Sequence, residues 1–209
     1  MEIVIAMDEI AAWVQGRVCD GYKMKAPPPH DASPVDGKYE YELLTPTAFP
    51  MFRPTRDRLP PSVAAPVPSV CVQFVEGKDE QFSASGSMRV RLVFATWSPG
   101  LHGRDVFRPK DGGGGVYAQW GGEEARAFYR RDAEGWREAW NLVDTARREI
   151  ESVEHIGGGL RVIHADGIAF GPVAEQETII DFYPYWYAWV EFGVGFGLQR
   201  HRRELSDFL

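Results

Sequence analysis

The sequence has little cysteine, and its most aromatic stretch is not a continuous apolar run. The two cysteines, Cys19 and Cys71, lie far apart, and Cys71 stands in the apolar run SVCVQFV. A buried thiol is more common there than a disulfide or a metal ligand, so we expect a reduced, cytoplasmic folding environment. Asp181, Glu191 and Arg200 interrupt the aromatic stretch 181–200. A membrane helix needs about 20 mostly apolar residues, so we expect no membrane partner.

Positive charge is also scarce, and the start of the chain lacks a basic region. The chain has 30 acidic and 23 basic residues, which gives a net charge of -7. This balance argues against a protein that grips nucleic acid by neutralising phosphates. The opening MEIVIAMDEI does not fit a signal peptide, because an acidic residue comes second and no basic residue precedes the apolar run.

Apolar and aromatic residues are plentiful enough to build a core. The composition is 44% hydrophobic, with seven Trp and twelve Phe in 209 residues. A chain of this length and composition can bury one sizeable core and is too short for two full-sized domains to be the first expectation. We therefore expect residues 1–209 to form a single α+β domain.

Two stretches have helical periodicity. In DEIAAWVQGRVC, from Asp8 to about Cys19, apolar residues recur at helical spacing after an aspartate that can cap the first turn. Residues 132–153 predict a longer helix with a continuous apolar stripe. The stripe consists of Trp136, Ala139, Trp140, Val143, Ala146, Ile150 and Val153. Both helices are expected to pack on a sheet, the N-terminal helix being the shorter.

Strand signals follow a different period. VPSVCVQFVEG and SMRVRLVFATW predict two neighbouring antiparallel strands, and the polar EGKDEQFSASG between them predicts a hairpin with a long loop. A short strand is expected in LRVIHA, and after another turn ETIIDF leads into a last strand in WYAWVEFGVGF. The order of helix, hairpin, long helix and further strands indicates an α+β fold with an antiparallel sheet rather than repeating βαβ units.

Two segments lack a sustained period. Residues 26–68 carry many of the fifteen prolines, and only KYEYELL within them resembles a strand. We expect this segment to be extended or irregular. Residues 98–122 are rich in glycine and predict an inserted loop or flap between a strand and the long helix.

Motifs for catalysis are missing from the sequence. No phosphate-binding loop, H-E-x-x-H, C-x-x-C or G-x-S-x-G is present, and the five histidines (His30, His102, His155, His164 and His201) are scattered. We therefore expect no catalytic, cofactor or metal site. Two local pairs, His102 with Asp105 and His164 with Asp166, leave open a hydrolase hidden by the glycine-rich flap.

The last predicted strand has two unlike faces. Trp186, Ala188, Val190, Phe192, Val194 and Phe196 alternate with Tyr187, Trp189, Glu191, Gly193 and Gly195. One face should enter the core, while Tyr187 and Trp189 on the other are candidates for a protein interface. The same aromatics could instead form a platform for a carbohydrate or another small ligand. The following RHRR, Arg200–Arg203, is either a solvated tail or a partner contact.

Four stretches resemble a known family. PSVCVQFVEGKDEQ, GSMRVRLVFATWSP, GWREAWNLVDTARREI and EQETIIDFYPYWYAWVEFGV, in this order, are similar to minor tail proteins of long-tailed phages and prophages that terminate or complete the tail tube. Gly135, Asn141, Leu142 and Arg147 match the helix pattern of that family, with Glu138 where an aspartate is usual. Tyr183, Pro184, Tyr185 and Trp186 match its last element. The resemblance spans residues 66–197.

The resemblance implies a non-enzymatic virion protein. It implies an α+β domain that assembles as a ring, typically a hexamer, in the virion tail, after assembly in the cytoplasm of the bacterial host. The expected partners are further copies of the chain, the tail tube protein and a head-completion or connector protein. DNA would pass through the ring without being tightly bound. The residues expected at the assembly interface are Tyr185, Trp186, Tyr187, Trp189, Arg200 and Arg202.

Overall fold

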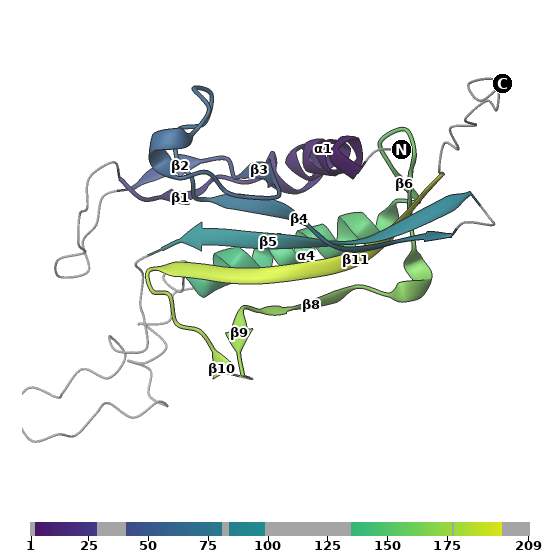
Figure 1. Cartoon of the computed structure of the whole chain (residues 1–209). Coiled ribbons are helices and arrows are strands. Elements are labelled where there is room, and N and C mark those ends of the chain that lie inside the picture. Colours follow the sequence, from purple (N-terminus) through teal and green to yellow (C-terminus); the bar gives the residue numbers. More distant parts are fainter. Residues whose placement is uncertain (1–2, 29–40, 81–83, 99–134, 177, 198–209) are drawn as a thin grey trace, which may run out of the picture.

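The computed structural model of the chain describes residues 3–28, 41–80, 84–98, 135–176 and 178–197. Within these ranges, two helices pack on one face of a curled, mostly antiparallel half-barrel sheet. The α+β class expected from the sequence is therefore confirmed. Figure 1 shows the helix α4 (Trp136–Ser152) behind the strands β5 (Ser85–Trp97) and β11 (Tyr185–Gly197), with the helix α1 (Ile3–Val14) above them.

Two long antiparallel ladders form the centre of the sheet. The strand β4 (Ser69–Glu80) pairs with β5, and β5 pairs with β11 along its whole length. The predicted hairpin is thus confirmed. The strand order is β3 (Thr47–Pro50), β4, β5, β11, β7 (Leu160–Val162) and β6 (His155–Ile156), and β8 (Ala169–Pro172) also pairs with β11. Among the described pairs, only β3 with β4 is parallel.

The hairpin is longer than the sequence predicts. Its ladder continues to the pair Glu80 and Ser85, past a register shift between Phe74 and Glu76, so most of the expected loop belongs to the strands. Gly86 is part of strand β5, where it pairs with Asp79 and Phe196. The ring of Phe196 lies over it, so a Cβ there would meet a ring carbon at 2.6 Å. A glycine that admits a neighbouring ring resembles a turn glycine when only the sequence is read.

The N-terminal helix begins earlier than expected. Helix α1 starts at Ile3 and continues without a break into the π-helical turn η1 (Gln15–Cys19), so Asp8 lies inside the helix and does not cap it. The expectation that this helix is the shorter one is wrong, because both helices span 17 residues. The cause is that Ala6 and Met7 pack into the core and extend the buried stripe upstream of Asp8.

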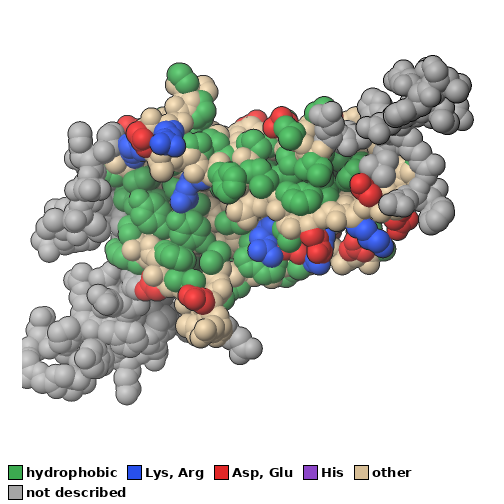
Figure 2. Space-filling view, viewed as in Figure 1, with side chains coloured by type: hydrophobic (Ala, Val, Ile, Leu, Met, Phe, Trp, Pro, Cys, Tyr) green, Lys and Arg blue, Asp and Glu red, His purple; other side chains and the backbone are tan. Residues whose placement is uncertain are grey.

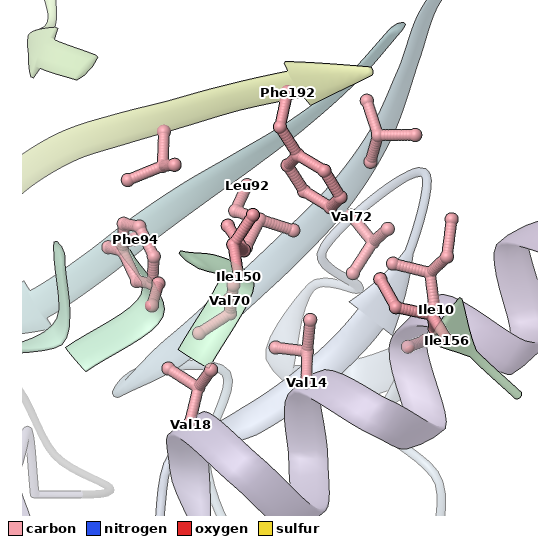
Figure 3. Packing of buried hydrophobic residues seen from close by; sticks show 14 of the residues in the cluster. Ile10, Val14, Val18, Val70, Val72, Leu92, Phe94, Ile150, Ile156 and Phe192 are labelled. Carbon is pink, nitrogen blue, oxygen red and sulfur yellow. The ribbon is translucent and has the colours of Figure 1, made fainter. Parts of the chain in front are cut away.

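Helix α4 buries the face that its periodicity predicts, with two changes. Ala139, Leu142, Val143, Ala146 and Ile150 are buried. Trp136, placed in the stripe by the sequence, is 41% exposed and lies under the Arg137 guanidinium, whereas Leu142 was missed. Figure 3 shows how side chains from α1, η1, β4, β5, α4, β6 and β11 meet between the helices and the sheet.

The remaining elements are short. The strand β1 (Met24–Ala26) pairs with β2 (Glu42–Leu44), and β9 (Ala174–Glu175) pairs with β10 (Thr178–Ile179). Two 3-10 turns are η2 (Arg56–Arg58) and η3 (His164–Asp166). The strand expected in KYEYELL is therefore present in part as β2, whereas β3 within the proline-rich segment was not foreseen. Apart from Ser98, the glycine-rich segment 98–122 lies outside the described residues.

Candidate functional site

The outer face of the sheet, turned away from both helices, carries the predicted second face of β11. Successive side chains of a strand point to opposite sides, so alternate residues of β11 turn outward. Ala188, Val190, Phe192, Val194 and Phe196 belong to the core below the helices, as the alternation predicts. Tyr187 packs instead in a separate small cluster, while Glu191 meets arginines. The outward side chains of β11 are therefore aromatic at one end of the strand and charged further along.

The aromatic end is a patch that we define as Phe182, Tyr185 and Tyr187 over Val67, Ala95 and Trp97. The last three residues are buried, and both tyrosines pack on them while staying partly exposed. Phe182 is 43% exposed and meets the Tyr187 ring edge-on at 5.2 Å between centroids. Figure 2 shows hydrophobic side chains gathered over this end of β5 and β11.

Arg53 lies beside the aromatic patch. Its guanidinium carbon is 5.8 Å from the centroid of the Tyr187 ring, and its Nη2 donates to the Tyr187 hydroxyl over 3.4 Å. A cation over a tyrosine ring orients the ring and gives the patch one positive edge. The patch can therefore bind an apolar surface that has an acidic rim.

Trp189, one of the predicted interface residues, is covered on the outer face. The Arg91 guanidinium lies 5.2 Å from its ring centroid, and its indole N–H donates to the carbonyl oxygen of Pro172 over 2.8 Å. Gly171 of β8 packs against the same ring, since a Cβ there would come within 3.1 Å of it. Because arginine and glycine contact this ring, it fixes β8 to β11 rather than offering a free stacking surface.

Trp186 lies on the helix side of β11, apart from the two outward aromatics. Its indole N–H donates to the carbonyl oxygen of Ser98 over 2.9 Å, and its ring packs against the main core. Trp186, Tyr187 and Trp189 therefore do not form one flat platform. Arg200 and Arg202, the other two residues expected at the interface, lie outside the described residues.

A compact ion cluster occupies the charged part of the outer face. Glu191 is only 7% exposed, and its two carboxylate oxygens meet Arg89 Nη2 at 2.6 Å and Arg91 Nη2 at 2.7 Å. Arg91 Nε also donates to Glu191 over 2.8 Å, and Arg89 reaches Glu76 at 3.4 Å. Sequence reasoning missed this cluster. The signal for it was a lone glutamate in an aromatic strand opposite a strand that alternates arginine with apolar residues.

A second polar cluster lies where β5 ends and α4 begins. Lys25 Nζ donates to the Ser98 hydroxyl over 3.2 Å and lies 3.8 Å from the Glu138 carboxylate. Burial raises the pKa of Glu138, and the nearby Lys25 opposes this rise. Ser98 is fully buried, so no substrate reaches its hydroxyl. This arrangement holds the start of α4 beside the end of β5. It does not form an exposed Ser–Lys nucleophile.

A pocket of about 230 Å³ opens between α4 and the edge of the sheet. The partner of β11 changes from β7, at Val194–Phe196, to β8, at Ala188–Glu191, and the chain between them bulges out through η3. This bulge creates the pocket. Its lining residues are Arg147, Glu151, Val162, Ile163, His164, Gly167, Ile168 and Phe192. The pocket depends on a change of strand partner, which the sequence pattern does not reveal.

Of the two histidine pairs, His164 with Asp166 lies in the described part of the chain. His164 Nε2 is 3.0 Å from the carbonyl oxygen of Val153, a backbone contact, and His164 shares the short turn η3 with Asp166. His102 and Asp105 lie outside the described residues. The described ranges contain no group of three or more His, Cys, Asp or Glu side chains that could hold a metal ion.

Both cysteines are free and buried, as the apolar surroundings of Cys71 predicted. Burial raises the pKa of Cys19 to about 12 and also raises that of Cys71, so neither thiol ionises readily.

Among the helices that the structure describes, none is long and apolar enough to cross a membrane. Comparison of the chain with protein-family models, with curated proteins and with solved structures gives no match.

Proposed function

We propose that the chain is a non-enzymatic structural protein of a long-tailed phage or prophage. In this proposal it terminates or completes the tail tube and forms the tail side of the head–tail joint. It would assemble as a ring in the cytoplasm of the bacterial host and remain in the virion tail. Its partners would be its own copies, the tail tube protein and a head-completion or connector protein.

One observation carries this proposal. The stretches that resemble tail-terminating proteins become β4, β5, α4 and β11, and these elements adjoin one another in the structure. The strand β5 pairs with both β4 and β11, and α4 packs its apolar stripe on β5 and β11. The resemblance therefore falls on one packed unit rather than on scattered segments, which supports a common architecture.

In this proposal the chain acts by assembling into a ring of defined geometry. A closed ring of identical copies uses two different contact patches on each copy, because every interface is heterologous. The described surface offers exposed apolar residues in separate places, among them Val4 and Phe182. We assign the aromatic patch to contacts with the tail tube or with neighbouring copies. The net charge of -7 suits a conduit that lets DNA pass without holding its phosphates.

A charge in the aromatic patch should test this assignment. We expect Phe182→Glu or Tyr187→Glu to prevent ring formation or tail joining, because a carboxylate in a desolvated apolar contact is strongly unfavourable. Val75→Glu is the matched control, since Val75 is 40% exposed and lies on the hairpin away from the patch. Negative-stain images of assembled tails give the readout, and thermal unfolding shows whether each variant is folded. Normal joining in both patch variants would contradict the assignment.

A carbohydrate-binding module is the alternative. It requires Trp186, Tyr187 and Trp189 to share a surface, whereas Trp186 packs on the helix side and Trp189 is covered by Arg91 and Gly171. Intrinsic tryptophan fluorescence during a glycan titration separates the two functions. The tail proposal predicts no saturable change, and a saturable change in a protein that forms no ring would favour the module.

A further inference from the structure

The first turn of α1 is an apolar knob that the fold leaves uncovered. Ile3, Val4 and Ile5 are 49%, 71% and 49% exposed, while Ala6, Met7 and Ile10 supply the buried side of the helix. Three consecutive residues spread over more than half of a helix circumference, so the sheet cannot cover all of them. Contiguous exposed apolar groups of this kind mark interaction surfaces.

The pocket beside α4 has the opposite shape, and its lining combines apolar side chains with Arg147, Glu151 and His164. Val162 and Phe192, 4% and 3% exposed, are the most buried of its lining residues, and Ile168 adds a partly buried side chain. A cavity of about 150 Å³ is enough to hold a benzene ring, so the pocket of about 230 Å³ has room for an aliphatic side chain of the knob.

One charge beside the knob is complementary to one charge at the pocket. Asp8 follows Val4 by four residues, so both lie on one side of the helix, and Asp8 is exposed. Arg147 lies at the pocket with its guanidinium 4.0 Å from the Phe170 ring centroid and 3.6 Å from Asp144. Its Nε is buried without a hydrogen-bond partner among the described residues. Seating Val4 in the pocket would bring a carboxylate towards this arginine, although Glu151 also lines the pocket.

We propose that the Ile3–Ile5 knob of one copy docks into the α4 pocket of the next copy. The proposal rests on the proposed ring function and names the contact that would join its subunits. Knob and pocket are different surfaces, so the contact is heterologous: each copy gives one knob and accepts another, and repeated docking either closes a ring or forms a filament. An isologous dimer would pair one surface with itself and would stop at two copies.

Two single variants separate the halves of this contact. Val4→Glu places a charge on the knob and leaves the pocket intact, whereas Ile168→Trp fills the pocket and leaves the knob intact. We expect each alone to weaken self-association by at least about tenfold, because a charge or a clash at a buried contact costs more than about 1.4 kcal/mol. Ile179→Glu is the matched control, since Ile179 is 67% exposed on the β9–β10 hairpin. Thermal unfolding identifies any variant that fails to fold.

Mixing the two variants gives the decisive result. The mixture has one intact knob and one intact pocket per pair, so light scattering should find one-to-one heterodimers and nothing larger. A second measurement, independent of affinity, uses a Val4→Cys, Ile168→Cys double variant under mild oxidation. It should give a disulfide-linked ladder beyond the dimer, while each single cysteine variant gives at most dimers. The native thiols should not interfere, because Cys19 and Cys71 are buried.

The possible failures are distinguishable. Wild-type rings that persist in Val4→Glu and Ile168→Trp, with no ladder from the double cysteine variant, would overturn this contact and leave the ring function standing. A wild-type chain that neither forms rings nor joins tails, and whose double cysteine variant gives no ladder, would overturn both. A disulfide-linked ladder without rings would support this contact and would count against the ring function.

Discussion

At the scale of single residues, Glu191 shows how β11 carries charge on an otherwise aromatic strand. Its carboxylate is 7% exposed and meets two arginines whose side chains are 52% and 40% exposed. The arginines keep part of their hydration, which limits the cost of burying the carboxylate. The periodicity of the strand predicts that Glu191 faces outward, but its partners depend on the register between β5 and β11. Local sequence does not contain that register.

Replacing Glu191 tests how much this ion cluster contributes to the stability of the fold. We expect Glu191→Gln to lower the free energy of unfolding by about 1–3 kcal/mol, because charge-assisted hydrogen bonds to two arginines are lost at a nearly buried site. Glu76→Gln is the control: its side chain is 65% exposed and it meets Arg89 alone, so its effect should stay below about 1 kcal/mol. Urea unfolding of both variants gives the comparison. Equal effects would show that burial of Glu191 has no energetic consequence.

Glu138 gives a prediction about pH. Burial raises its pKa above the ordinary value of 4.5, so the folded state holds the proton at pH values where the unfolded chain has released it. The stability that this proton on Glu138 gives the folded state is fully present below pH 4.5, and it is lost as the pH rises through the higher pKa of the folded state. We therefore expect the melting temperature of Glu138→Gln to gain on that of the wild type as pH increases across this window. A difference between the two melting temperatures that stays the same at every pH would contradict the raised pKa of Glu138.

At the scale of elements, periodicity predicted the hairpin, the last strand and helix α4 well. Val90, Leu92 and Phe94 stand at alternate positions of SMRVRLVFATW, and the structure buries all three. Prediction failed where the deciding contact is distant in sequence. Gly86 belongs to a strand because it pairs with Phe196 of β11 as well as with β4, and β3 forms because β4 offers it a parallel edge. The pocket arises from a similar cause, the change of strand partner along β11.

Helix α4 offers a direct test of which residues face the sheet. Leu142 is fully buried, so Leu142→Ala should destabilise the fold by about 2–5 kcal/mol through lost burial and a residual cavity. Trp136, although larger, is 41% exposed and packs on Arg137, so Trp136→Ala should cost about 1 kcal/mol or less. Denaturant midpoints of the two variants decide the matter. The reverse order of effects would mean that the sequence-based stripe, which included Trp136 and omitted Leu142, is the better description.

At the scale of the whole molecule, the described fold leaves apolar side chains exposed in separate places. Val4 on the first helix and Phe182 before β11 belong to different elements. These side chains are not among the buried residues that form the core between the helices and the sheet, part of which Figure 3 shows. Exposed apolar groups that serve no internal packing are suited to contacts with other chains. We therefore propose that this surface serves assembly.

Whether the chain works as a ring is tested by its mass in solution over a wide concentration range. Light scattering gives the mass, and negative-stain images of the same sample give the shape. We expect closed rings of one size, typically six copies by the resemblance, that disappear in Val4→Glu and persist in Ile179→Glu. A strict monomer at every concentration that also fails to join tail tubes would contradict the claim.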